Sequence, residues 1–430
     1  MSCNRISLTA SIVVCCLLMH CSSLTEPTEP SDPSPIRLPS ELTATERRLV
    51  TATNEFTFDL FEKIAAVTPA DSNLFISPMS AAYALAMAYN GAAGDTRDSI
   101  SATLKIGDLT TNQVNESFAG LTDVLTNADQ TVTITIANAV WHSTRLTLVP
   151  EFADIVRTFF GARVSGLDFT DPSSVDTINS WVSENTNGKI KKVFESPLDP
   201  SWVYILANAV YFKADWTVPF DTRLTRADTF HLADGSAMSA DFMWLDSWTR
   251  RDDSGRFDPD VTYLVKDNEF TAFSLPYGDR WFRMTVFLPD TSLPVTQFIS
   301  QFTVEKWDQW RSEFLSGRFK AKLPRFKFGY EVALDDILAS MGMNIAFQSG
   351  AADFSNMFEG GGVWIDTVIH KTFVQVDEKG TEAAAVTVIG GPTSLPPFID
   401  CNRPFVFVIS EKESGAVMFV GKVARPVWEE

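Results

Sequence analysis

A connection of 26 residues (378–403) joins two segments that have the composition of β-strands. The segment before it is TVIHKTFVQV (367–376) and the segment after it begins RPFVFVIS (403–410); both are rich in β-branched and aromatic residues. A structureless connection of this length is uncommon inside a compact domain and is usually functional or disordered. The connection nevertheless has ten small or β-capable residues without proline, Gly380 to Ile389, before its first proline at Pro392. This stretch has the composition of a β-strand that could join a sheet at a later stage.

The stretch from Gly380 to Ile389 meets the requirements of a strand that enters the middle of a sheet. Such a strand donates a ladder hydrogen bond from nearly every residue, which excludes proline. Its side chains alternate between two faces, and Thr381, Ala383, Ala385 and Thr387 on one face are small enough to avoid overpacking a core, which typically costs about 1–3 kcal/mol. Gly380 supplies the backbone freedom of a hinge. The alternative interpretation is a surface loop that is simply small and apolar.

Composition bounds the class of protein. The chain has 430 residues, 45% of them hydrophobic and 33 of them Phe, so it can bury a sizeable core. Its net charge of −19 argues against a nucleic-acid surface, and the one basic run, GKIKKVF (188–194), is interpreted as a solvated helix end. No repeat or linker follows residue 42. We therefore predict one mixed α+β domain over residues 43–430.

The first 42 residues have the composition of a leader and a tether. Residues 1–21 combine Arg5 with an interrupted apolar stretch, which favours a signal peptide over a membrane span. Leu18-Met19-His20-Cys21 resembles a bacterial lipoprotein box, although His20 departs from the usual small residue, so the alternatives are a lipid on Cys21 and ordinary cleavage nearby. Residues 22–42 are Pro-, Ser- and Thr-rich and predict a flexible tether. We expect an extracytoplasmic protein, secreted or lipid-anchored at the cell envelope, which contacts the membrane only through that lipid.

Local patterns place several elements within the domain. Thr43 and Glu46 form a capping box that starts a helix, and Ser77 is the N-cap of a second helix, with Pro78 in its first turn and Gly91 just past its end. Hydrophobic periodicity indicates further elements. These are strands at 131–140, 202–212 and 281–289, an amphipathic helix at 332–343, a hairpin across the DG step of ADGSAM, and a second hairpin from 405–410 to 416–423.

Motifs for catalysis, metal binding and cofactor binding are missing. The only histidines outside the leader are His142, His231 and His370, and no pair of them has metal-ligand spacing. We predict no cofactor and no metal. A hydrolase built from a serine and a distant histidine stays open, because such triads assemble in three dimensions. Cys401 is the only cysteine after Cys21, so it has no partner for a disulfide within the domain, and we interpret it as a packing residue.

Seven runs, in order along the chain, carry a resemblance to one family. They are FTFDLFEKI, NLFISPMSAAYALAMAYNGAAGDT, INSWVSENTNGKI, LANAVYFKADWTVPFD, LPRFKFGYEVALDDILASMGM, VDEKGTEAAAV and RPFVFVISEKESGAVMFVGKVARP. Over residues 43–426 the chain resembles the serpins. The resemblance implies an α+β fold with three β-sheets, eight or nine helices and an exposed reactive-centre loop. It also implies a monomer that is a suicide inhibitor of serine proteases, in which the cleaved loop enters the main sheet.

The resemblance assigns roles to particular residues. A polar cluster called the shutter corresponds to Ser77, Ser80, Asn208 and His370, and the breach at the top of the sheet corresponds to Trp216. Glu378 matches an acidic residue that pairs with a basic partner, here Arg325 in LPRF. The loop hinge, by the same resemblance, comprises Glu378, Gly380, Thr381, Glu382, Ala383, Ala384 and Ala385.

The bait bond has two candidate positions. When loop positions are counted forward from Glu378 by the family's convention, Ser394 is the residue on the acyl side of the bond. When they are counted back from RPFVF, the residue on the acyl side is Thr393. We favour the second, because a deletion is absorbed more easily at Gly390-Gly391 than in the proline-rich side that follows the bond. No Lys or Arg lies between Gly380 and Asn402, which disfavours trypsin-like targets and favours elastase-like or subtilisin-like proteases, with papain-type cysteine proteases open. The alternatives are a non-inhibitory surface binding protein and an enzyme.

Overall fold

The computed structural model describes residues 38–195, 197–247, 258–379 and 396–429. From Ile36 onward the chain forms one compact unit. Within the described residues no helix combines the length and the apolar character that crossing a membrane requires. Nine α-helices occur in this part of the chain: α1 Ala44–Val67, α2 Pro78–Gly91, α3 Gly94–Thr103, α4 Thr111–Asn127, α5 Pro150–Phe160, α6 Ser173–Asn185, α7 Val295–Ile299, α8 Val304–Glu313 and α9 Asp335–Leu338.

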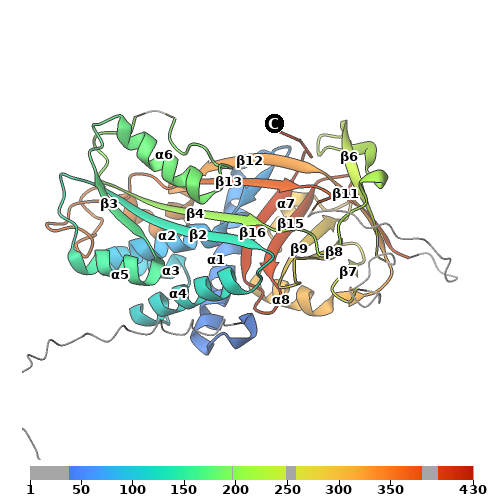
Figure 1. Cartoon of the computed structure of the whole chain (residues 1–430), viewed down its shortest axis with the longest axis horizontal. Coiled ribbons are helices and arrows are strands. Elements are labelled where there is room, and N and C mark those ends of the chain that lie inside the picture. The colour runs from blue at the N-terminus through green and yellow to red at the C-terminus, as the bar shows by residue number, and fades with distance from the viewer. Residues whose placement is uncertain (1–37, 196, 248–257, 380–395, 430) are drawn as a thin grey trace, which may run out of the picture. The chain divides into compact units, whose positions relative to one another are not determined.

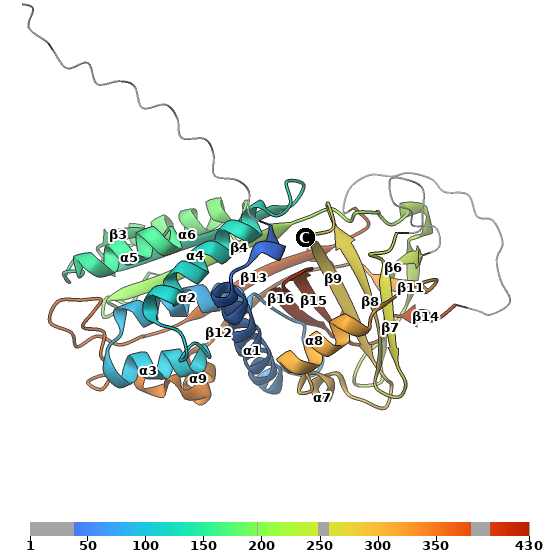
Figure 2. The same cartoon turned by 90° about the horizontal axis from the view of Figure 1, so that it is seen from below.

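Eleven of the described strands form two sheets. The larger has seven strands in the order β1-β16-β15-β9-β8-β7-β10, and the smaller has four in the order β14-β11-β6-β5. Helices α1, α7 and α8 lie against the seven-stranded sheet (Figure 2). The strands of the two sheets are β1 Leu74–Ile76, β5 Arg226–His231, β6 Ala237–Asp246, β7 Thr262–Lys266, β8 Phe270–Tyr277, β9 Phe282–Pro289, β10 Leu315–Ser316, β11 Lys320–Pro324, β14 Phe398–Asp400, β15 Phe405–Glu411 and β16 Val417–Val423.

The remaining strands form two separate small sheets where a single main sheet was expected. One has three strands, β3 (Arg163–Leu167), β2 (Thr133–Ser143) and β4 (Tyr204–Lys213), and the other pairs β12 (Phe326–Ala333) with β13 (Ile369–Val376). The described residues therefore contain four hydrogen-bonded sheets, because β4 and β13 lie next to each other without pairing (Figure 1).

Helices cover both faces of the divided sheet. On the outer face α6 packs over β2 and β4, and a small apolar cluster that includes Trp141, Trp181 and Ile178 fills the space between them. On the inner face α2 is buried between β4 and β16, as its nearly uniform apolar composition predicts. The two half-sheets are thus held in place largely by the layers above and below them.

Local capping chemistry matches the sequence prediction, but three helix ends differ from it. Thr43 and Glu46 form the reciprocal capping box, and Ser77 caps α2. Gly91, however, is the last residue of α2 rather than the residue beyond it. A Cβ added at Gly91 would lie 2.5 Å from Met357 Cε. The helix predicted at 332–343 is wrong at its start, because Val332 and Ala333 pair with β13, and at its end, because Gly342 has a φ of 117°.

The basic run at 188–194 is not a helix end. Helix α6 stops at Asn185, three residues before the run, and Gly188 has a φ of 71° that only glycine adopts freely. Lys189 is exposed, and its ammonium lies over the Phe373 ring at 5.3 Å from the centroid. Lys189 therefore lies beside Phe373 of β13, whereas the N–H groups of Val193 and Phe194, at the end of the run, donate to Asn179 of α6.

Candidate functional site in the divided main sheet

The facing edges of β4 and β13 are the central feature of the site. Strand β4 pairs with β2 along one edge, and β13 pairs with β12 along one edge. Neither strand has a ladder partner on its other side among the described residues. Because backbone N–H and C=O groups alternate between the two edges of a strand, each of these edges presents a row of groups available to a further strand.

The two strands run in the same direction. Just past the end of β4, the Trp216 indole Nε1 donates to the carbonyl of Asp377, just past the end of β13, at 2.9 Å. Further down, α2 contacts both strands through its first turn, at Asn208 of β4 and His370 of β13. A chain that leaves β13 and reverses would therefore lie antiparallel to both strands, which is a favourable pairing geometry.

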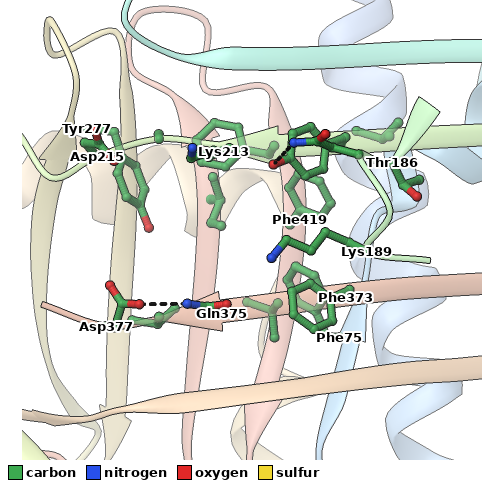
Figure 3. A pocket seen from close by; sticks show the side chains of 18 of the residues that line it. Phe75, Thr186, Lys189, Lys213, Asp215, Tyr277, Phe373, Gln375, Asp377 and Phe419 are labelled. Atoms are coloured by element: carbon green, nitrogen blue, oxygen red, sulfur yellow. Dashed lines mark hydrogen bonds between the residues drawn. The ribbon is translucent and has the colours of Figure 1, made fainter. Parts of the chain in front are cut away.

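A cavity of about 520 Å³ lies between the two strands (Figure 3). Its inner wall is apolar and includes Val210, Phe212, Val374 and Val376, whose side chains face the main core. Phe373, in contrast, packs with the outer cluster beneath α6. The remaining walls are supplied mainly by Phe75, Lys189, Tyr211, Lys213, Asp215, Tyr277, Gln375, Asp377, Ile409 and Phe419.

On the β13 side, the shutter residues form one buried hydrogen-bonded branch. The backbone N–H of Ser77 donates to Nε2 of His370 at 3.0 Å, and the Ser77 hydroxyl donates to the Met418 carbonyl at 2.9 Å. Since Nε2 accepts a hydrogen bond, the imidazole proton is on Nδ1. Complete burial lowers the pKa of His370 to about 4, because desolvation opposes its charged form.

On the β4 side, a second branch starts from the same helix turn. The Ser80 hydroxyl donates to Oδ1 of Asn208, whose amide donates to Oδ1 of Asn138 on β2 at 2.6 Å. Asn138 in turn donates to the Phe160 carbonyl at 2.8 Å. The four residues assigned to one cluster thus form two branches. They meet at the N-terminus of α2, where the Ser80 N–H donates to the Ser77 hydroxyl.

The buried imidazole makes folding stability pH-dependent. The His370 pKa is about 4 in the fold and about 6.5 when unfolded, so the unfolded chain binds the proton more readily. The contribution is complete above pH 6.5 and is lost as the pH falls toward 4, about 3 kcal/mol in total. We expect urea unfolding at pH 7, 6, 5 and 4 to show this loss, and His370→Gln, which retains an acceptor, to reduce it. Parallel pH profiles for the two proteins would contradict this assignment.

Trp216 connects the two half-sheets at the end of the gap where β4 and β13 finish, which is called the upper end below. Its ring stacks on Tyr277 with a centroid distance of 4.3 Å and an interplanar angle of 11°. Its indole N–H holds the Asp377 carbonyl, as described above, and the ring itself is buried. The breach tryptophan assigned from the resemblance therefore lies where β13 ends and the loop connection begins.

Glu378 is fixed from two sides. Its Oε2 lies 3.3 Å from Nε of Arg325, at the turn between β11 and β12, so the expected ion pair is present. Its Oε1 accepts a hydrogen bond from the Thr225 hydroxyl at 2.6 Å, and its carbonyl accepts one from the Phe220 N–H at 3.2 Å. Only 7% of Glu378 is exposed. Glu378 is thus held by the connection that follows β4 and by the turn that precedes β12.

The remaining assigned residues lie outside the described part of the chain. These are Cys21, Gly380, Thr381, Glu382, Ala383, Ala384, Ala385, Thr393 and Ser394.

Three contributors to the site carry no sequence signal that the motif analysis used. Asn138 and Thr225 are common residue types on strand and turn segments, and each meets its partner across a long sequence separation, 70 residues from Asn208 and 153 from Glu378. Lys189 lies in a run that composition assigns to solvent. An alternation rule places Asn138 and Asn208 on strand faces, but it does not pair the strands.

The geometry gives no support to a serine hydrolase at these residues. Ser77 contacts the His370 imidazole, but it does so through its backbone N–H while its hydroxyl donates to a carbonyl. A nucleophilic serine would instead donate its hydroxyl proton to the imidazole. In the described ranges no group of three or more His, Cys, Asp and Glu side chains is arranged to hold a metal ion. Burial also raises the pKa of the Cys401 thiol, which makes it a poor nucleophile.

Comparison with known proteins gives a consistent result. A family model described as "Serpin (serine protease inhibitor)" matches residues 51–426. A serpin-like protein of Methanosarcina acetivorans is 30% identical over 89% of this chain and 88% of its own length. The native structure of tengpin, a thermophilic serpin, covers 88% of this chain and 94% of its own at 29% identity and a TM-score of 0.78. Human thyroxine-binding globulin complexed with thyroxine covers 89% of this chain and 100% of its own at 27% identity and a TM-score of 0.78.

Proposed function

Because the chain belongs to the serpin family, we propose that it is a suicide-type inhibitor of serine proteases. In this proposal a protease cleaves the segment after Lys379, and the amino-terminal part of that segment enters the gap between β4 and β13. Strand addition of this kind is a recognised binding mode of serpins. The observation that carries the proposal is the pair of strand edges that face each other across an apolar-walled cavity and have no ladder partner among the described residues.

The length of the gap suits the sequence that follows it. Strand β13 has 8 residues and β4 has 10, and strands rise about 3.3 Å per residue, so the edges extend about 26–33 Å. The proline-free stretch from Gly380 to Ile389 has ten residues and so has the same reach. It begins four residues after the end of β13, at the end of the gap where Trp216 and Glu378 lie.

The proposed targets are proteases with shallow specificity pockets. Thr393 and Ser394, the candidates for the acyl side of the bait bond, are small and uncharged. A trypsin-like enzyme needs a cation to meet the carboxylate in its pocket, and none is present between Gly380 and Asn402. We therefore propose elastase-like or subtilisin-like targets, with papain-type cysteine proteases as a second class.

A second candidate function is a non-inhibitory binding protein. Thyroxine-binding globulin, whose structure holds thyroxine, resembles this chain over nearly its whole length. A protein of that kind would be cleaved in the loop as an ordinary substrate. The absence of proline and bulky residues from Gly380 to Ala385 favours the inhibitor, because nothing in the sequence there opposes strand entry.

A denaturing gel tests the proposal directly. Pancreatic elastase and subtilisin incubated with the protein should each give a covalent complex that resists SDS, whereas trypsin should give none at the bait bond. Papain reports on the second class. Cleavage by elastase and subtilisin without any complex would favour the non-inhibitory alternative, and proteolysis of added casein by the protein alone would favour an enzyme.

The cut is expected after Thr393. On the carboxyl side of the loop, the described chain begins at Pro396, and β14 (Phe398–Asp400) pairs with β11. This paired, proline-rich side fixes the distance from the bond to the four-stranded sheet. Intact-mass analysis of the released carboxyl-terminal peptide should give a fragment that begins at Ser394. A fragment that begins at Leu395 would favour cleavage after Ser394, as the count from Glu378 gives. A fragment that begins at Gly390 within a stable complex would show that neither Thr393 nor Ser394 precedes the bait bond.

We also propose that the protein acts outside the cytoplasm. The leader (1–21) and the tether (22–42) are consistent with secretion, or with a lipid on Cys21 that keeps the inhibitor at the cell envelope. Mass spectrometry of the mature N-terminus distinguishes a lipidated Cys21 from a free cleavage product.

A further inference from the structure

The last residues of the chain extend the half-sheet formed by β12 and β13. The Lys327 N–H donates to the Val427 carbonyl at 2.8 Å, and the Glu429 N–H donates to the Lys327 carbonyl at 2.9 Å, so Trp428 is paired in parallel with Lys327. The Gly329 N–H also donates to the Glu429 carboxylate at 3.0 Å. These bonds fix the backbone of Trp428 on the edge of β12 that is opposite β13.

The Trp428 ring covers the face of the Arg325 guanidinium. The guanidinium carbon lies 4.3 Å from the ring centroid, and the Lys327 ammonium lies 5.8 Å from it. The ring is 42% exposed and borders a cavity of about 570 Å³ that β6 and Arg325 also line. Part of Trp428 therefore faces open space, and Arg325 is the nearer of the two cations that contact its ring.

This stacking is compatible with the ion pair that Arg325 forms. A guanidinium is planar, so an aromatic ring on its face leaves the N–H groups in its plane free to meet a carboxylate. Nε of Arg325 lies 3.3 Å from Oε2 of Glu378, and the Arg325 backbone N–H is fixed by the Asp241 carbonyl at 2.8 Å. Arg325 therefore lies between the chain terminus and the residue at the end of the gap.

We propose that Trp428 is a positioning residue that orients Arg325 toward Glu378, so that the carboxyl terminus controls how readily the upper end of the gap opens. Without the ring, the guanidinium gains rotamer freedom and water, and its ion pair with Glu378 weakens. The carbonyls of Asp377 and Glu378 would then release their donors, the Trp216 indole and the Phe220 amide, more often. The positioning itself is a property of the resting protein, and only its effect on inhibition rests on the proposed function.

Hydrogen exchange in the full-length protein tests the positioning. In Trp428→Ala the Trp216 indole N–H and the Phe220 amide should exchange about two- to fivefold faster, the range expected from losing a cation–π contact at an exposed site. Amides of the β15–β16 pair should be unchanged, because the effect is local. Trp428→Phe, which keeps a ring over Arg325, should restore most of the protection. The matched control is Leu315→Ala, which truncates a 59% exposed apolar side chain on β10 and should change none of these rates.

Two further variants separate the stack from general loosening. Lys327→Gln removes the second cation beneath the ring and should leave exchange at Trp216 and Phe220 nearly unchanged. In an Arg325→Gln background, Trp428→Ala should add nothing, because the residue it acts through is gone. Equal rates in Trp428→Ala and the control, a uniform increase that includes β15–β16, or a full effect in the Arg325→Gln background would each overturn the proposal.

Inhibition supplies a second readout that separates this inference from the proposed function. If the protein is an inhibitor, Trp428→Ala should lose elastase-trapping capacity about two- to fivefold faster during storage at 37 °C, since opening at the gap is easier. If neither protein traps a protease but the local exchange difference is present, the proposed function fails and the positioning role stands. If both proteins trap equally and exchange identically, the positioning role fails and the proposed function stands.

Discussion

Thr381→Arg will abolish inhibition and leave a folded protein that proteases cleave as a substrate. In the proposed mechanism, residue 381 is among the first to enter the gap, on the small-residue face directed toward the core. The core side of the gap is apolar and is lined by Val210, Phe212 and Val374. An unpaired buried charge opposes entry by several kcal/mol, which is enough for hydrolysis of the acyl-enzyme to win over trapping.

The neighbouring position supplies the matched control for that variant. Glu382→Arg places the same charge on the opposite face, toward solvent, and should retain most of the SDS-resistant complex. Both variants should keep the melting temperature of the parent protein, because in the proposed mechanism this segment joins the sheet only after cleavage. If Thr381→Arg formed as much complex with elastase as the parent does, insertion through this face would be excluded.

Cleavage of the loop will raise the unfolding temperature by at least about 10 °C. An inserted ten-residue strand gains ladder bonds on both sides, at a net value of about 1 kcal/mol each. For a chain of this size the average entropy of unfolding converts each kcal/mol into about 1 °C. Among the described residues of the uncleaved protein, the facing edges of β4 and β13 have no ladder partner that would supply these bonds.

Calorimetry before and after limited elastase treatment measures this difference. Cleaved Thr381→Arg is the control, since it carries the same nick and should show a much smaller rise. Identical melting curves for the intact and cleaved parent protein would mean that the cleaved segment stays outside the sheet.

Much of the fold could be predicted because local chemistry and tertiary contacts agree. The Thr43–Glu46 capping box and the Ser77 cap use only neighbouring residues, and both are present. The helix predicted at 332–343 failed for the opposite reason. Val332 and Ala333 fit a helical period, but pairing with His370 and Ile369 gives them ladder bonds and places them in β12.

The resemblance named residues of the candidate site, but it did not predict how they connect. Family resemblance assigned Ser77, Ser80, Asn208 and His370 to one cluster, whereas hydrogen bonds divide them between the two halves of the sheet. That division follows from strand pairing at long sequence separation, which periodicity does not encode. Trp428 was missed because an aromatic residue near a chain end has no local pattern that marks it as a partner of Arg325.

In the proposed mechanism, the facing edges of β4 and β13 also bear on which strand the protein accepts. Backbone groups recognise any extended segment, so selection of the molecule's own segment depends on its tether. That segment begins four residues after β13, and short flexible links give effective concentrations in the millimolar range. A segment from another copy at about 1 μM therefore competes at a disadvantage of roughly a thousandfold. The preference for the molecule's own segment over that of another copy thus depends on local concentration. This preference falls in proportion as the concentration of the protein rises.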